Sequence, residues 1–119
     1  MIGYVTLGTN DLDKAAAFYD ALLADMGGNR AMESDNLVAW SNGGAMLVAI
    51  KPADGNPASA GNGTMVALKC DDNAQVDALH AKAMSLGAAD EGAPGLRGDS
   101  FYGGYFRDLD GNKLVFFNM

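Results

Sequence analysis

The sequence predicts an α+β fold of two tandem βαβββ modules, whose curved mixed sheets surround a cavity and whose helices lie on the outer face. Three observations support this fold class: an internal repeat, the same order of strands and helix in each half, and a Gly- and Pro-rich stretch between the halves. The predicted parts of this single domain are a first module at 1–51, a linker at 52–63 and a second module at 64–119.

The repeat is visible at two places in each half. Residues 4–11 (YVTLGTND) match residues 65–72 (MVALKCDD), and both segments precede an Ala-rich amphipathic stretch. Residues 44–50 (GAMLVAI) match residues 111–117 (GNKLVFF), so the offset rises from 61 to 67 residues. The second copy is therefore longer by about six residues, which we expect in a loop within residues 92–104.

In the first half, the pattern changes from strand to helix and back to strands. A helix is expected to begin at a cap formed by Asn10 or Asp11 and to end at Gly27, because apolar residues recur three and four positions apart between them. A hairpin is expected around Asn42 to Gly44. The expected strands lie at residues 2–8, 30–32, 37–41 and 45–51.

The second half repeats this order. Its helix is expected to begin at Asp72 or Asn73 and to end at Gly87, with apolar residues again three and four apart. His80 lies at helical spacing among them, which favours packing over a catalytic role. The expected strands lie at residues 64–70, 87–90, 102–107 and 112–118.

Composition excludes several classes of protein. The chain carries 15 acidic and 8 basic residues, a net charge of −7, and no basic stripe, so we expect no nucleic-acid partner. No apolar stretch is long enough to span a bilayer and the N-terminus lacks the features of a signal peptide. Cys70 is the only cysteine, which excludes an internal disulfide. We therefore expect a cytoplasmic protein with no membrane partner.

Two terminal motifs carry a resemblance to a known family. The chain opens with φ-x-x-V-x-L-x-x-x-D-L-x-x-A-x-x-F-Y at residues 2–19, where φ is an apolar residue and x is any residue. It closes with Y-F-R-D-x-D-G-N-x-L at residues 105–114. Together with the two modules, these motifs resemble the vicinal oxygen chelate superfamily, which includes glyoxalase I, bleomycin and fosfomycin resistance proteins and extradiol dioxygenases. The resemblance is strongest to small glyoxalase-like members and spans nearly the whole chain. Such proteins often pair modules between two chains, so we expect a homodimer.

The resemblance also implies where a metal would bind. Members that use a metal take His, Gln or Glu ligands from the first and last strands of each module, and these positions fall here on Tyr4, Val48, Met65 and Val115. Valine offers no donor atom, and a thioether or a neutral phenol is a poor ligand for a divalent ion of this kind. We therefore expect no metal and no cofactor.

The same strands are expected to line a cavity. Residues two apart share a face of a strand, so Tyr4 and Thr6, or Met46, Val48 and Ile50, should point to the same side. Polar and aromatic groups from neighbouring segments are expected at the mouth. The candidate ligand-binding residues are Tyr4, Trp40, Val48, Met65, Arg97, Tyr102, Val115 and Phe117.

The expected function is metal-independent binding of a small organic molecule in this apolar and aromatic cavity, similar to sequestration by bleomycin resistance proteins. One alternative is a metal-dependent lyase, isomerase or dioxygenase of the same superfamily, or a metal-free acid–base enzyme using Tyr4 and Arg97. Another is an interaction module whose cavity is filled by side chains. No catalytic residue is assigned from the sequence.

Overall fold

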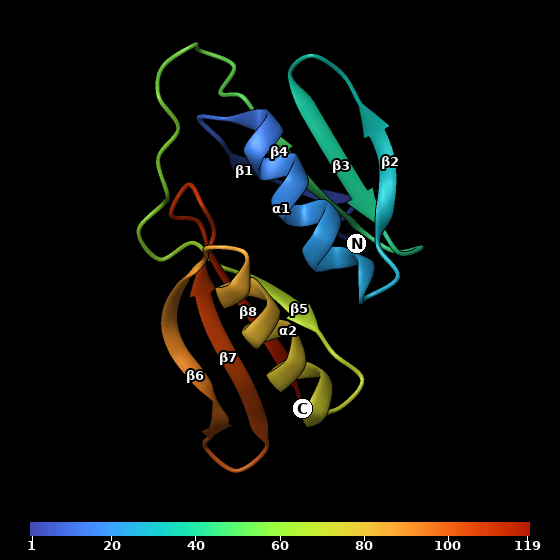
Figure 1. Cartoon of the computed structure of the whole chain (residues 1–119), viewed down its shortest axis with the longest axis vertical. Helices are drawn as coiled ribbons and strands as arrows, with labels where there is room; N and C mark the ends of the chain where they lie inside the picture. Colours follow the sequence, from blue (N-terminus) through green and yellow to red (C-terminus); the bar gives the residue numbers. More distant parts are fainter. The chain divides into compact units, whose positions relative to one another are not determined.

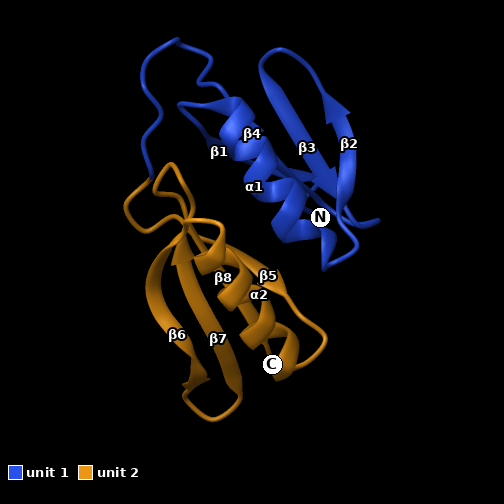
Figure 2. Cartoon of the chain, in the orientation of Figure 1, with its two compact units in different colours: residues 1–60 blue, residues 61–119 orange.

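Ten helices and strands make up the chain, and a computed structural model describes all 119 residues (Figure 1). They divide into two compact units, Met1–Ala60 and Gly61–Met119 (Figure 2). Each unit contains one four-stranded mixed sheet and one helix in the order βαβββ. The predicted α+β fold class with two βαβββ modules is confirmed.

The first unit follows the order expected from the sequence. Its elements are β1 (Tyr4–Gly8), α1 (Leu12–Ala24), β2 (Asn29–Glu33), β3 (Leu37–Ser41) and β4 (Met46–Ile50). The strands lie in the order β1-β4-β3-β2, with β1 parallel to β4 and the other pairs antiparallel. The N-cap of α1 is Asp11, whose side chain accepts a hydrogen bond from the backbone N–H of Lys14 at 3.1 Å.

The second unit repeats this topology. Its elements are β5 (Val66–Lys69), α2 (Asn73–Ser85), β6 (Ala89–Arg97), β7 (Phe101–Arg107) and β8 (Lys113–Asn118). The strand order is β5-β8-β7-β6, and only the pair β5 and β8 is parallel. Asp72 caps α2 by accepting from the N–H of Gln75 at 2.8 Å. Both helices begin where their polar caps predicted.

Each helix covers one side of its own sheet. In the first unit, Phe18, Tyr19 and Leu22 of α1 are buried together with Trp40 and Leu47 of the sheet. The Tyr19 and Trp40 rings lie 5.4 Å apart. The corresponding buried set in the second unit is Val76, Leu79 and Ala83 of α2 with Phe106, Leu114 and Phe116. Neither helix is long and apolar enough to cross a membrane.

The longer second copy differs from the expected loop. Residues 92–104 do not form a loop, because β6 continues to Arg97 and β7 starts at Phe101. The Gly- and Pro-rich sequence suggested a loop, but here it forms an edge strand whose pairing shifts around Gly92 and Gly95. Bulged edge strands tolerate glycine and proline, and Pro94 lies within this one. The extra residues therefore lengthen a hairpin.

Candidate functional site

An apolar pocket lies on the side of the first sheet that α1 leaves uncovered. Its volume is about 260 Å³. The four strands β1 to β4 all contribute to it, and in β1, β3 and β4 the lining residues alternate with those packed against the helix. The lining residues are Tyr4, Thr6, Met32, Leu37, Ala39, Met46, Val48 and Ile50.

Strand register explains why these side chains converge. Thr6 and Ala39 are both paired with Val48, one from each neighbouring strand, so the three lie side by side across the sheet. Tyr4 is paired with Met46 in the same way. The predicted orientation of Tyr4, Thr6, Met46, Val48 and Ile50 toward one face is thus confirmed.

The pocket has a buried floor and an exposed rim. Ala39 and Val48 in the floor are only 1% and 4% exposed, whereas Tyr4 and Met32 at the rim are 61% and 55% exposed. Among the lining side chains, only the hydroxyl groups of Tyr4 and Thr6 are polar. A cavity of roughly 150 Å³ holds benzene, so this pocket of about 260 Å³ has space for an aromatic molecule larger than benzene.

Three lining residues had not been assigned to the site from the sequence. Leu37 and Ala39 alternate along β3 with residues that contact the helix, and this alternation was a signal that could have found them. Met32 had no such signal. It faces the pocket because the pairing of β2 with β3 shifts between Arg30 and Met32, which a sequence pattern does not reveal.

The corresponding face of the second sheet carries Val115 and Phe117. Val115 is fully buried, and the Phe117 ring stacks on Phe101 at 5.3 Å with an angle of 5° between the planes. Gly103 lies between these groups. A Cβ at that position would come within 2.6 Å of the Phe101 ring and 3.2 Å of Val115, so only glycine allows this packing.

Arg97 and Met65 lie on the same unit. Arg97 is the last residue of β6, not part of a loop, and its guanidinium lies 5.4 Å from the centre of the Tyr105 ring. Its Nη2 also donates to the carbonyl oxygen of Ala93 at 2.7 Å. Met65 immediately precedes β5 and is 41% exposed.

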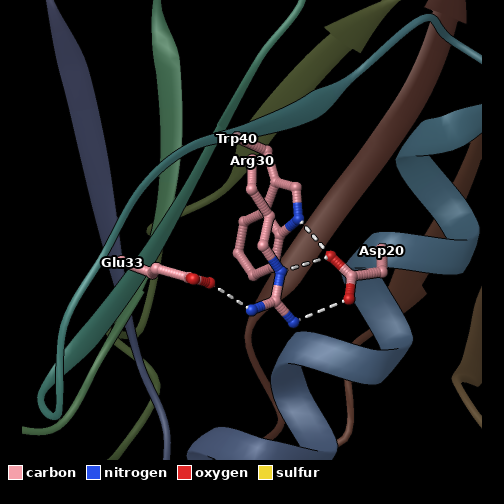
Figure 3. Close-up of polar contacts among 4 residues, drawn as sticks. All are labelled: Asp20, Arg30, Glu33 and Trp40. Carbon is pink, nitrogen blue, oxygen red and sulfur yellow. Dashed lines mark hydrogen bonds and ion pairs between the residues drawn. The ribbon is translucent and has the colours of Figure 1, made fainter.

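Trp40 does not line the first pocket, because it lies on the helix side of β3. Its side chain is 2% exposed and its Nε1–H donates to Asp20 Oδ1 at 2.8 Å. Arg30 donates to both oxygens of Asp20, at 2.9 and 2.7 Å, and to Glu33 (Figure 3). Hydrogen bonding by Arg30 lowers the pKa of Asp20 below its usual value, and Trp40 adds to this effect. This cluster fixes β2 and β3 to α1.

Tyr102 lies on the helix side of the second sheet. Its hydroxyl donates to Asp77 Oδ1 of α2 at 2.6 Å, and this hydrogen bond raises the pKa of the Tyr102 phenol. Tyr102 is paired with Asn118, one residue away from Phe117 on β8, and neighbouring residues of a strand point to opposite faces. Tyr102 and Phe117 are therefore not brought together.

The positions at which family members place metal ligands do not fit a metal. Tyr4 and Val48 lie in the first pocket, and Met65 and Val115 belong to the second unit. Together these four side chains offer only a phenol and a thioether, which are weak donors for a divalent ion. No group of three or more His, Cys, Asp or Glu side chains in the chain is placed to hold a metal ion.

The remaining reactive side chains are also engaged elsewhere. The imidazole Nε2 of His80, on the helix side of the second sheet, lies 3.0 Å from the carbonyl oxygen of Tyr105 and 3.3 Å from Asp90. Cys70 is buried at the end of β5, and burial, followed by the charge of Asp71, raises the pKa of its thiol to about 11. A thiol with this pKa is a poor nucleophile at neutral pH.

Comparisons with known proteins agree with this architecture. Residues 1–116 match the model of the Glyoxalase/Bleomycin resistance protein/Dioxygenase superfamily. A glyoxalase/bleomycin resistance protein from Albidiferax ferrireducens is similar in structure, with a TM-score of 0.93 and 32% sequence identity. The match covers 100% of this chain and 98% of that one.

Two further solved structures share the fold. A lactoylglutathione lyase from Agrobacterium tumefaciens has a TM-score of 0.75 and 25% identity, over 99% of this chain and 92% of that one. A glyoxalase/bleomycin resistance protein/dioxygenase family enzyme from Burkholderia phytofirmans has a TM-score of 0.81 and 21% identity, over 98% and 96% of the two chains. No curated protein sequence matches.

The match over residues 1–116 and the 32% identity over the full chain agree with the two βαβββ units. This chain belongs to the glyoxalase/bleomycin resistance protein/dioxygenase superfamily.

Proposed function

We propose that this protein binds a small organic molecule in the apolar pocket of its first unit and that no metal takes part. The observation that carries this proposal is the pocket of about 260 Å³ on the open face of the first sheet. Ligand pockets are typically concave and mostly apolar, with few polar groups that orient the ligand. Tyr4 and Thr6 supply those polar groups here.

The metal-independent part of the proposal is supported by side-chain chemistry. A metal-dependent lyase, isomerase or dioxygenase needs several nitrogen or oxygen ligands. The four positions at which family members place those ligands hold two valines, a thioether and a phenol in this chain. An acid–base mechanism with Tyr4 and Arg97 has weaker support, because the Arg97 guanidinium already contacts the carbonyl oxygen of Ala93 and the Tyr105 ring.

The alternative of a filled cavity has less support in the first unit than in the second. The floor residues Ala39 and Val48 are small, and the rim side chains leave space above them. In the second unit, by contrast, aromatic rings pack beside Val115. The first pocket is therefore the better candidate for an apolar ligand.

Isothermal titration with N-phenyl-1-naphthylamine, a neutral apolar probe that carries a naphthyl and a phenyl group, tests this proposal. The protein is first dialysed against EDTA so that any divalent ion is removed. We expect saturable binding of one molecule per chain with a Kd on the order of 100 μM, from about −0.3 kcal/mol per heavy atom for a ligand of this size. Binding that appears only after zinc, nickel, iron or manganese is added would contradict the metal-independent role.

We also propose that the protein is a homodimer. The edge strands β1 and β2 of the first sheet carry the exposed apolar residues Tyr4 and Met32, and open sheet edges often pair between copies. Sedimentation velocity at micromolar concentration should give the mass of two chains.

A further inference from the structure

Basic side chains are concentrated on one face of the second sheet. The chain has eight Lys and Arg residues, and strand pairing places four of them on the face that carries Val115 and Phe117, away from α2. These four are Lys69, Arg97, Arg107 and Lys113. This concentration is unexpected in a chain with a net charge of −7.

The register shows that these side chains share a face. Lys69 is paired with Phe117, and Arg97 is paired with Phe101. Arg107 is paired with Lys113 across the β7–β8 ladder. Paired residues in adjacent strands point to the same side of a sheet, so all four basic groups lie on the face that carries the stacked Phe101 and Phe117 rings.

Tyr105 lies between two of the basic groups. The Arg97 guanidinium is 5.4 Å and the Lys113 ammonium 5.5 Å from the centre of its ring. Both distances are within cation–π range, so the ring holds the two charges near each other. Arg97 is exposed and Lys113 is half-buried, which leaves both groups accessible to a solute.

One carboxylate partly offsets this charge. Glu91 accepts a hydrogen bond from Arg107, and Arg107, followed by Lys113, lowers the pKa of Glu91. A single carboxylate does not balance four basic groups. Like charges placed directly opposite each other in a sheet, as Arg107 and Lys113 are, destabilise it. A bound anion would relieve this repulsion.

We propose that this face binds a planar aromatic anion. Its carboxylate would be held by Arg97 and Lys113 beside Tyr105, and its ring would lie against the stacked Phe101 and Phe117. Guanidinium groups suit this task because they bind carboxylates through two parallel hydrogen bonds and stack on aromatic rings. This inference rests on the proposed small-molecule function but uses a different face, so the two can fail separately.

The charge of the ligand provides the test. Titrations of the full chain in EDTA would compare three compounds with the same ring system: 2-naphthoate, the neutral 2-naphthamide and the cationic 2-naphthylmethylammonium. We expect 2-naphthoate to bind about tenfold more tightly than the amide, the value of one charged hydrogen bond, and the cation to bind more weakly still. Acetate at the same concentration should not compete, because it lacks the ring.

Substitutions locate the binding groups. Arg97→Gln and Lys113→Gln should each weaken 2-naphthoate binding about tenfold while leaving 2-naphthamide unchanged. Lys82→Gln is the matched control, because it removes the same charge from α2, on the other side of the sheet, and should have little effect. Raising the salt from 50 mM to 500 mM should weaken binding of the anion only.

Equal affinities for 2-naphthoate and 2-naphthamide, or equal effects of the Lys82 and Lys113 substitutions, would overturn this inference. N-phenyl-1-naphthylamine would still bind the first pocket in that case. Loss of N-phenyl-1-naphthylamine binding with a preserved preference for 2-naphthoate would instead contradict the proposed function of the first pocket alone.

Discussion

Ala39→Leu should abolish binding of N-phenyl-1-naphthylamine with little change in the free energy of unfolding, whereas Ala49→Leu should lower that free energy by about 1 to 3 kcal/mol. Both alanines are almost completely buried, but Ala39 forms the pocket floor and Ala49 lies one residue beyond Val48, on the helix side. A larger side chain fills empty space at the first position and overpacks the core at the second.

Urea unfolding and isothermal titration of the two variants provide the measurement. The pair is closely matched, because the substitution is identical and both residues lie in central strands of the same sheet. Equal destabilisation by the two substitutions would mean that side chains already fill the region above Ala39, which favours an interaction module over a binding protein.

Asp20→Ala should lower the free energy of unfolding at pH 7 by about 1 to 3 kcal/mol, because it leaves the buried Nε1–H of Trp40 without its acceptor. It also removes the carboxylate that holds Arg30. Asp13→Ala is the control, since Asp13 is an exposed residue in the first turn of α1 and should contribute only a few tenths of a kcal/mol.

The effect of Asp20→Ala should depend on pH with a defined sign. Arg30 lowers the pKa of Asp20 below its usual value of 3.8, so the carboxylate stabilises the folded state above that pH. As the pH falls below 3.8 toward the lowered pKa, this contribution is lost. Urea unfolding at pH 7 and at pH 3 should therefore show a smaller difference between wild type and variant in acid. A difference that grows in acid would contradict the assigned role of Arg30.

Much of the fold could be predicted because the helix caps, the alternation along the strands and the internal repeat all indicate the same two βαβββ modules. The helices begin at Asp11 and Asp72, where a carboxylate can accept from the free backbone N–H groups of the first turn. The internal repeat also predicts that the strands and the helix follow one another in the same order along both halves of the chain. Alternation along β1 and β4 also correctly oriented Tyr4 and Val48, since residues two apart share a face.

The sequence is a poorer guide to features that depend on how neighbouring strands are paired, such as the face of the sheet on which a side chain lies. The sequence predicts Trp40 and Tyr102 as ligand-binding residues, but the polar group of each is hydrogen-bonded to a carboxylate of the helix in its own unit. Pairing of Trp40 with Leu47 decides its face, and the sequence does not specify this pairing directly. The sequence predicts the start of β6 but not its continuation to Arg97, because the glycines and the proline there are typical of loops.

The central claim is that a small organic molecule occupies the first pocket without a metal. Intermolecular NOEs between N-phenyl-1-naphthylamine and the methyl groups of the EDTA-treated protein test it most directly. Leu47 and Val48 are adjacent in β4 but face opposite sides of the sheet, so each serves as the control for the other. The account predicts NOEs from the probe to the methyl groups of Val48 and Ile50 and none to Leu47. NOEs to Leu47, or no NOEs until a divalent ion is added, would contradict it.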